Sequence, residues 1–266
     1  MTDETVMAPV TVSKLRAGSV IARAFSVMFS NFPAFMLLAV MLSLIPLIFQ
    51  IMLGGVQSLD ISLSAQNMQQ DVLVLSVVVA LLSVMLSYVA QGAIVYGAVR
   101  SLDDQRTSFT ECVGRGLVLA LPLLAIVILY SLGVIVSFML LVVPGVVFVC
   151  VYFVVMPVTV MEKPGIFRSF SRSAELTRGN RWRILGLLAL SMLVTFVAAF
   201  GFGLVIGIII AFVGPGENAL LAGALFEAVI NAVLIVFFAS LVSVTYYDLR
   251  HFEGGANLEK LSSVFD

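Results

Sequence analysis

The sequence is poor in charged residues, histidine and cysteine. Of its 266 residues 11% are charged and 61% hydrophobic, whereas about 25% of a soluble domain is typically charged. There is one histidine, His251, and there are two cysteines, Cys112 and Cys150. A metal centre needs several such ligands, and no phosphate-binding loop, nucleophilic serine motif or zinc-protease motif occurs. We therefore expect no cofactor, no metal site and no catalytic residues, and the net charge of −1 argues against a nucleic-acid partner.

The sequence contains long runs of apolar residues. Six of them reach, or nearly reach, the ~20 residues that cross ~30 Å of hydrocarbon, and they cover residues 32–53, 72–99, 117–140, 144–160, 184–213 and 219–247. The sequence thus predicts an all-α membrane bundle of six transmembrane helices in three hairpins, forming one integral membrane domain over residues 1–266. We expect residues 1–10 to be disordered, 11–29 to form an interfacial helix and 248–266 to form a polar tail.

The positions of lysine and arginine predict the orientation. If the N-terminus lies inside the cell, all 14 basic residues fall in inside segments. The charged residues of the outside loops are then Asp60, Asp71 and Glu217, all of them acidic. Cytoplasmic loops are enriched in lysine and arginine, so both termini are expected in the cytoplasm of a bacterial cell, with the chain in the inner membrane.

The strongest basic cluster is the segment 161–183, MEKPGIFRSFSRSAELTRGNRWR, which we call the basic segment. A helix from Pro164 to Arg178 is expected, because proline suits a first turn and Gly179 a C-terminal stop. Two interpretations remain open. The segment either binds anionic lipid headgroups or a phosphate group, or it only sets topology and docks against other segments. The candidate contacts are Arg168, Arg172, Arg178, Arg181 and Arg183.

A weak internal repeat is visible. A basic amphipathic stretch precedes a hairpin in each of three units, 11–99, 105–160 and 163–247. All three units would begin and end on the same side of the membrane, so the repeats are parallel rather than inverted.

One acidic residue, Glu227, lies inside a predicted span and shares a helix face with Asn231. An ionisable group there is costly unless it faces protein or water. Glu227 is either a proton or ligand site, or a protonated carboxyl bonded to another helix or reaching the outer interface.

A set of short motifs is spread over the second half of the sequence: Pro144-Gly145, Pro157, Glu162, Arg172-Ser173, Leu176-Thr177-Arg178-Gly179, Trp182-Arg183, Tyr246-Tyr247-Asp248-Leu249-Arg250 and Glu253-Gly254. With these motifs the chain resembles the membrane domain fused to some bacterial glycerophosphodiester phosphodiesterases, and related stand-alone uncharacterised inner-membrane proteins. The resemblance implies a six-helix bundle. It implies no phosphodiesterase activity, because the catalytic barrel of those enzymes is absent here. We also expect Asp248 or Glu175 to pair with arginines of the basic segment, which would tie the last span to it.

These observations favour a non-catalytic membrane protein, acting as a lipid-interacting scaffold or partner-binding module with a basic cytoplasmic rim. The expected partners are membrane phospholipids, anionic ones above all, with a protein partner or a homo-oligomer as further options. A small transporter using polar groups such as Glu227, Asn231 and Gln91 is the alternative, and a membrane enzyme of lipid metabolism is the weakest candidate.

Overall fold

The computed structural model describes residues 17–40, 74, 77–78, 88–103, 105, 108–213 and 217–265. At positions 109, 209, 213, 217–222, 224, 227 and 254–265 only the backbone is described. The predicted disorder of 1–10 lies outside these residues, as do most of the predicted spans 32–53 and 72–99.

The described residues form helices and no strand. The labelled helices are α1 (Ala17–Ser30), α4 (Phe109–Val118), α5 (Ala120–Leu140), α6 (Val142–Val151), α7 (Val155–Glu162), α8 (Ile166–Leu176), α9 (Arg181–Val213) and α10 (Glu217–Phe265). Two further helices cover residues 32–40 and 88–102.

Four described stretches are long and apolar enough to cross a membrane, namely Ala120–Leu140, Val142–Glu162, Arg181–Phe212 and Ala228–Glu253. A fifth is present if Ala17–Ser30 and Phe32–Val40, bent by 81°, count as one span. Large apolar side chains on these helices stand exposed, such as Met139 at 83% and Phe212 at 87%. Because such surfaces need lipid rather than water around them, the chain is an all-helical, membrane-embedded protein. The six spans remain a prediction.

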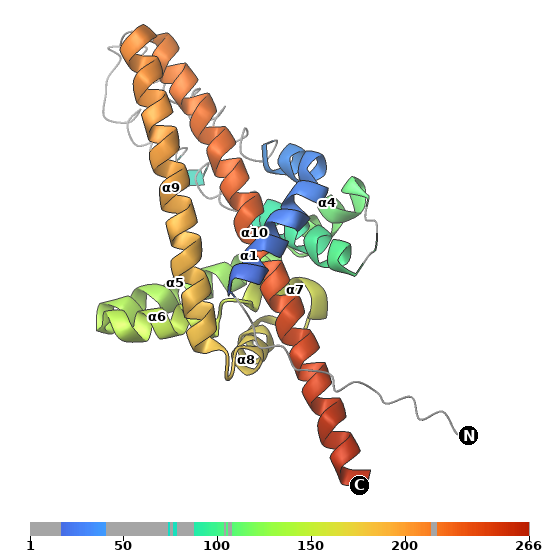
Figure 1. The fold of residues 1–266 in the computed structure, drawn as a ribbon. Helices are drawn as coiled ribbons and strands as arrows, with labels where there is room; N and C mark the ends of the chain where they lie inside the picture. Colours follow the sequence, from blue (N-terminus) through green and yellow to red (C-terminus); the bar gives the residue numbers. More distant parts are fainter. Residues whose placement is uncertain are drawn as a thin grey trace, which may run out of the picture.

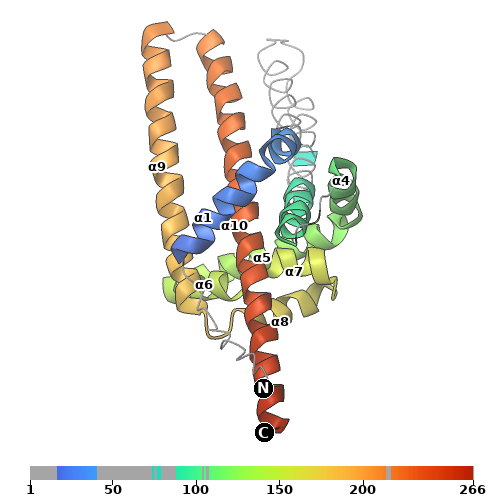
Figure 2. The same cartoon turned by 45° about the vertical axis from the view of Figure 1, so that its right-hand side comes forward.

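The helices are not arranged as a bundle of parallel rods. In Figures 1 and 2, α9 and the first half of α10 form a long hairpin, and α5 and α6 lie crosswise to it near the start of α9. Helix α1 crosses the middle of α10 and packs against it. The described helices therefore differ in direction, and a bundle of six spans stays a prediction.

The predicted span 144–160 is divided into two helices. Pro157 has no amide hydrogen and its ring clashes with the carbonyl four residues earlier, which fits the break at residues 152–154. The hydroxyls of Ser173 and Thr177 donate to the Val151 carbonyl at 3.1 and 3.0 Å. Helix α8 thereby satisfies an acceptor at the end of α6, as an apolar surrounding requires.

Three smaller predictions also change. The predicted span 144–160 begins two residues earlier than expected, at Val142 in the first turn of α6, where Pro144 is tolerated because the first amides of a helix have no internal partner. Helix α8 is shorter than the expected 164–178 and lies between Gly165 and Gly179, with φ of 94° and 86°. The tail 248–266 is not a separate segment, since α10 continues to Phe265.

The buried core lies where several helices meet the second half of α10. Fully buried side chains there come from α1, helix 88–102, α5, α9 and α10, including Val20, Ile94, Leu123, Leu187, Leu241 and Tyr246. This core fixes the charged ends of these helices relative to one another.

Helices α5 and α6 approach closely through glycine, which generates a prediction. A Cβ at Gly145 would lie 2.6 Å from the Phe138 ring, at its Cγ, whereas a Cβ at Gly201 on α9 would meet nothing within 4 Å. Because overpacking costs about 1–3 kcal/mol, Gly145→Ala should lower the melting temperature of the purified protein. Gly201→Ala is the matched control and should leave it unchanged or raise it slightly. Equal effects of both substitutions would show that this contact does not hold α5 against α6.

Candidate functional site at the charged helix junctions

Arg172 on α8 is the centre of the largest polar cluster. Its guanidinium donates to both carboxylate oxygens of Glu253 on α10, at 2.9 and 2.5 Å. It also donates to Glu162 at the end of α7, at 3.2 Å, and contacts Glu175 on its own helix at 3.5 Å. The Tyr246 hydroxyl donates to the other Glu162 oxygen at 2.9 Å. These bonds join α7, α8 and α10, and we call them the Arg172 junction.

The geometry of this junction suits arginine specifically. A planar guanidinium fork matches the two oxygens of a carboxylate, which a lysine ammonium cannot do. The Arg172 side chain is 25% exposed. Its bond to Glu253, together with the negative charge of Glu162, raises the pKa of Arg172 above its ordinary value, so the charge of this arginine is permanent.

A second junction joins α1 to α10. Arg23 of α1 forms an ion pair with Asp248, whose side chain is 10% exposed. We expected Asp248 or Glu175 to pair with an arginine of the basic segment. Glu175 does contact Arg172 of that segment, whereas the partner of Asp248 comes from the N-terminal helix, because α1 crosses α10 at this point.

A third junction joins helix 88–102 to α4. The hydroxyl of the buried Tyr96 donates to Glu111 at 2.7 Å and accepts from Arg100 at 3.2 Å. The guanidinium groups of Arg100 and Arg115 lie over the Tyr96 ring, 5.4 and 5.6 Å from its centre.

The three junctions follow the repeat units of the sequence. The short helix that opens a unit, α4 or α8, bonds to the last helix of the unit before it, and α1 of the first unit bonds to α10 of the third. Tyr96, Arg100 and Asp103 have the same spacing as Tyr246, Arg250 and Glu253. Both tyrosines donate to a glutamate of another helix. This shared spacing is the sequence signal that could have found these residues.

Of the other arginines of the basic segment, Arg168, Arg178 and Arg181 stay exposed and Arg183 is half-buried. Among the described residues no ion pair is found for Arg168, Arg178 or Arg181, and Arg183 donates to the Asn180 side chain at 3.4 Å. Arg178 and Arg181 line an open groove of about 480 Å³ with Ser171, Ala174, Glu175 and Gly179. Arg168 and Arg172 line a neighbouring groove of about 510 Å³ with Glu162, Pro164, Ser171 and Glu175. We call these the two basic grooves.

The intramembrane polar residues lie elsewhere. Asn231 on α10 and Gln91 on helix 88–102 both line a cavity between the apolar helices. The backbone of Glu227 lies one turn before Asn231, but its side chain is outside the described part of the structure. Among the described side chains, no three or more histidine, cysteine or acidic groups gather as metal ligands would.

Comparison of the chain with protein-family models, with curated proteins and with solved structures finds no match.

The Arg172 junction leads to a stability prediction. Arg172→Gln removes the fork and leaves Glu162 and Glu253 half-buried without their cation, so we expect a loss of about 1–3 kcal/mol in unfolding free energy. Arg168→Gln is the matched control, since Arg168 is exposed on the same helix, and it should change stability by less than ~0.5 kcal/mol. The two variants are compared by thermal unfolding in the same detergent. Equal losses would contradict the assignment of Arg172 as the structural arginine.

Proposed function

We propose that the chain is a non-catalytic protein of the bacterial inner membrane that binds anionic lipid headgroups at its basic grooves and serves as a lipid-interacting scaffold. Both termini lie in the cytoplasm in this proposal, and the chain is related to the phosphodiesterase-associated membrane domains that it resembles. Its partners are phospholipids, with a protein partner or a second copy as additional ligands of the same surface.

The observation that carries the proposal is the pairing of exposed aromatic rings with unpaired arginines. Phe167 is 80% exposed and Trp182 85% exposed. Beside them in sequence stand Arg168 and Arg181, without ion pairs among the described residues. Aromatic side chains favour the membrane interface, and arginine forks suit phosphate oxygens. This combination supports a surface at headgroup depth rather than one in bulk solvent.

In this proposal the arginines of the basic segment have two roles. Arg172 is occupied by carboxylates, so it supports the fold and contributes little to a ligand. Arg178 and Arg181, in contrast, line a groove in which Glu175 is the only acidic residue among the described ones. The first interpretation of the basic segment, headgroup binding, therefore rests on Arg168, Arg178, Arg181 and Arg183.

A small transporter is the alternative function. Gln91 and Asn231, two of the polar residues expected to serve a transporter, both line one cavity. This favours a transporter over an enzyme of lipid metabolism. The lining of that cavity is mainly apolar, however, and hydrophilic solutes need more polar contacts than it offers. Binding of a lipid fits the basic grooves and this apolar cavity better than transport of a hydrophilic solute does.

The proposal predicts a headgroup preference that depends on two arginines. A juxtamembrane arginine contributes about 1 kcal/mol to anionic lipid binding, so Arg178→Gln with Arg181→Gln should weaken binding of phosphatidylglycerol about 30-fold. Binding of phosphatidylcholine should not change. Apparent dissociation constants are measured by native mass spectrometry of the full chain titrated with each lipid.

Two single variants sharpen this experiment. Glu175→Gln removes the negative charge of the groove and should tighten phosphatidylglycerol binding. Arg250→Gln, an exposed arginine of α10 outside the grooves, should have no effect. Equal retention of both lipids by the unaltered protein, or equal losses in the groove variant and in Arg250→Gln, would contradict headgroup binding at this site.

A further inference from the structure

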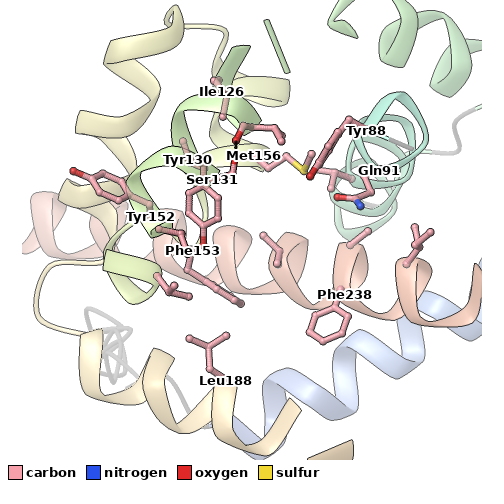
Figure 3. Close-up of a pocket in the computed structure, with 18 of the residues that line it drawn as sticks. Tyr88, Gln91, Ile126, Tyr130, Ser131, Tyr152, Phe153, Met156, Leu188 and Phe238 are labelled. Carbon is pink, nitrogen blue, oxygen red and sulfur yellow. Dashed lines mark hydrogen bonds between the residues drawn. The ribbon is translucent and has the colours of Figure 1, made fainter. Parts of the chain in front are cut away.

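A cavity of about 630 Å³ lies between helix 88–102, α5, α6, α7, α9 and α10 (Figure 3). Its volume falls within the ~300–1,000 Å³ of small-molecule pockets. Val95, Ile126, Val155 and Ala239, all at most 6% exposed, form its buried part. Exposed residues, among them Ser131, Ile135 and Asn231, form its rim. The cavity is therefore open on one side and closed by core residues on the other.

The described residues that line the cavity carry no charge. Most of them are aliphatic or aromatic, and the polar ones are Tyr88, Gln91, Tyr130, Ser131, Tyr152 and Asn231. A charged group that entered this space would lose its hydration without gaining a counter-ion. The lining thus selects a ligand that is apolar over most of its length.

Three of the polar side chains have unused hydrogen-bonding capacity. Tyr88, Gln91 and Tyr130 are half-buried, and the described part of the chain supplies no hydrogen-bond partner for their side chains. Figure 3 shows Tyr88 and Gln91 on one side of the cavity and Tyr130 on the other. Polar groups in an apolar surrounding are stabilised by a partner. A ligand that offers hydrogen-bonding oxygen atoms to these side chains would supply one.

We propose that this cavity binds the acyl chain of a membrane lipid, with the ester oxygens of the lipid bonded to Tyr88, Gln91 or Tyr130. The chain fills the apolar space, and the uncharged ester region meets the uncharged polar groups. The rim is continuous with the apolar exterior, since Ile135 is 55% exposed and its neighbour Val136 58%, so a lipid can enter from the bilayer. The headgroup stays outside, and the site is indifferent to headgroup charge.

This site is separate from the basic grooves, and the inference goes beyond the headgroup binding proposed above. The two sites share no described lining residue. Substitutions at one are therefore expected to leave the other unchanged, and either proposal can fail alone.

The test uses the full chain in a steroidal detergent, whose rigid rings cannot replace an acyl chain in the cavity. Isotope-labelled monoolein, an uncharged acyl ester, is titrated, and bound lipid is quantified after gel filtration. We expect saturable binding of about one molecule per chain, unchanged by added phosphatidylglycerol headgroup (glycerophosphoglycerol without acyl chains) and unchanged in the Arg178→Gln, Arg181→Gln variant.

Two cavity variants and one control locate the binding. Ala239→Phe places a ring in the buried part of the cavity and should reduce monoolein binding at least tenfold. Ala199→Phe adds the same volume on an exposed face of α9 outside the cavity and should have no effect. Tyr88→Phe with Tyr130→Phe preserves the shape but removes two hydroxyls, and should weaken binding about fivefold.

Unsaturable uptake by the unaltered protein would overturn the proposal, as would equal binding by Ala239→Phe and Ala199→Phe. If Ala239→Phe does not fold, the double tyrosine variant decides, and undiminished monoolein binding by it would overturn the assignment of the ester contacts. Loss of binding only in the arginine variant would assign the lipid to the basic grooves instead.

Discussion

The fork between Arg172 and Glu253 is the contact on which the charged end of this protein depends. Helices α7 and α8 follow one another in the chain, whereas α10 is distant from both in sequence, and Arg172 bonds to carboxylates on all three. The side chains of Arg172, Glu162 and Glu253 are only partly exposed, so their charge-assisted hydrogen bonds are weakened less by water than those of a fully exposed ion pair. One guanidinium with three acidic partners thereby joins the ends of these helices.

The two other junctions extend the same principle around the molecule. The hydrogen bond between Tyr96 and Glu111 joins the first repeat unit to the second. The ion pair between Arg23 and Asp248 joins the first repeat unit to the third. Only part of the basic segment is used in this way. Arg168, Arg178 and Arg181 remain exposed beside Phe167 and Trp182, which is the arrangement expected at headgroup depth. In our proposal, the junctions hold the helices around a cavity for an acyl chain while the remaining arginines meet the headgroups.

Much of the local structure could be predicted from the sequence. Apolar runs located α5, α9 and the first part of α10, and Gly179 marked the end of α8. The break after Val151 was missed, because residues 144–160 were predicted as one apolar span and the bonds from Ser173 and Thr177 are tertiary. The crosswise direction of α5 and α6 also could not be predicted from the sequence, since hydropathy gives the length of a helix but not its direction. Pairing of Asp248 with Arg23 rather than with the basic segment depended on the path of α1 across α10, which no local pattern encodes.

A thermodynamic double-mutant cycle between Arg172→Gln and Glu253→Gln tests this account most directly. Unfolding free energies of the two single variants and the double variant are measured in one lipid environment, with a parallel cycle between Arg168→Gln and Glu253→Gln as reference. The account predicts a coupling of at least ~1 kcal/mol for Arg172 with Glu253 and close to zero for Arg168 with Glu253. Additive losses for Arg172 and Glu253 would contradict it.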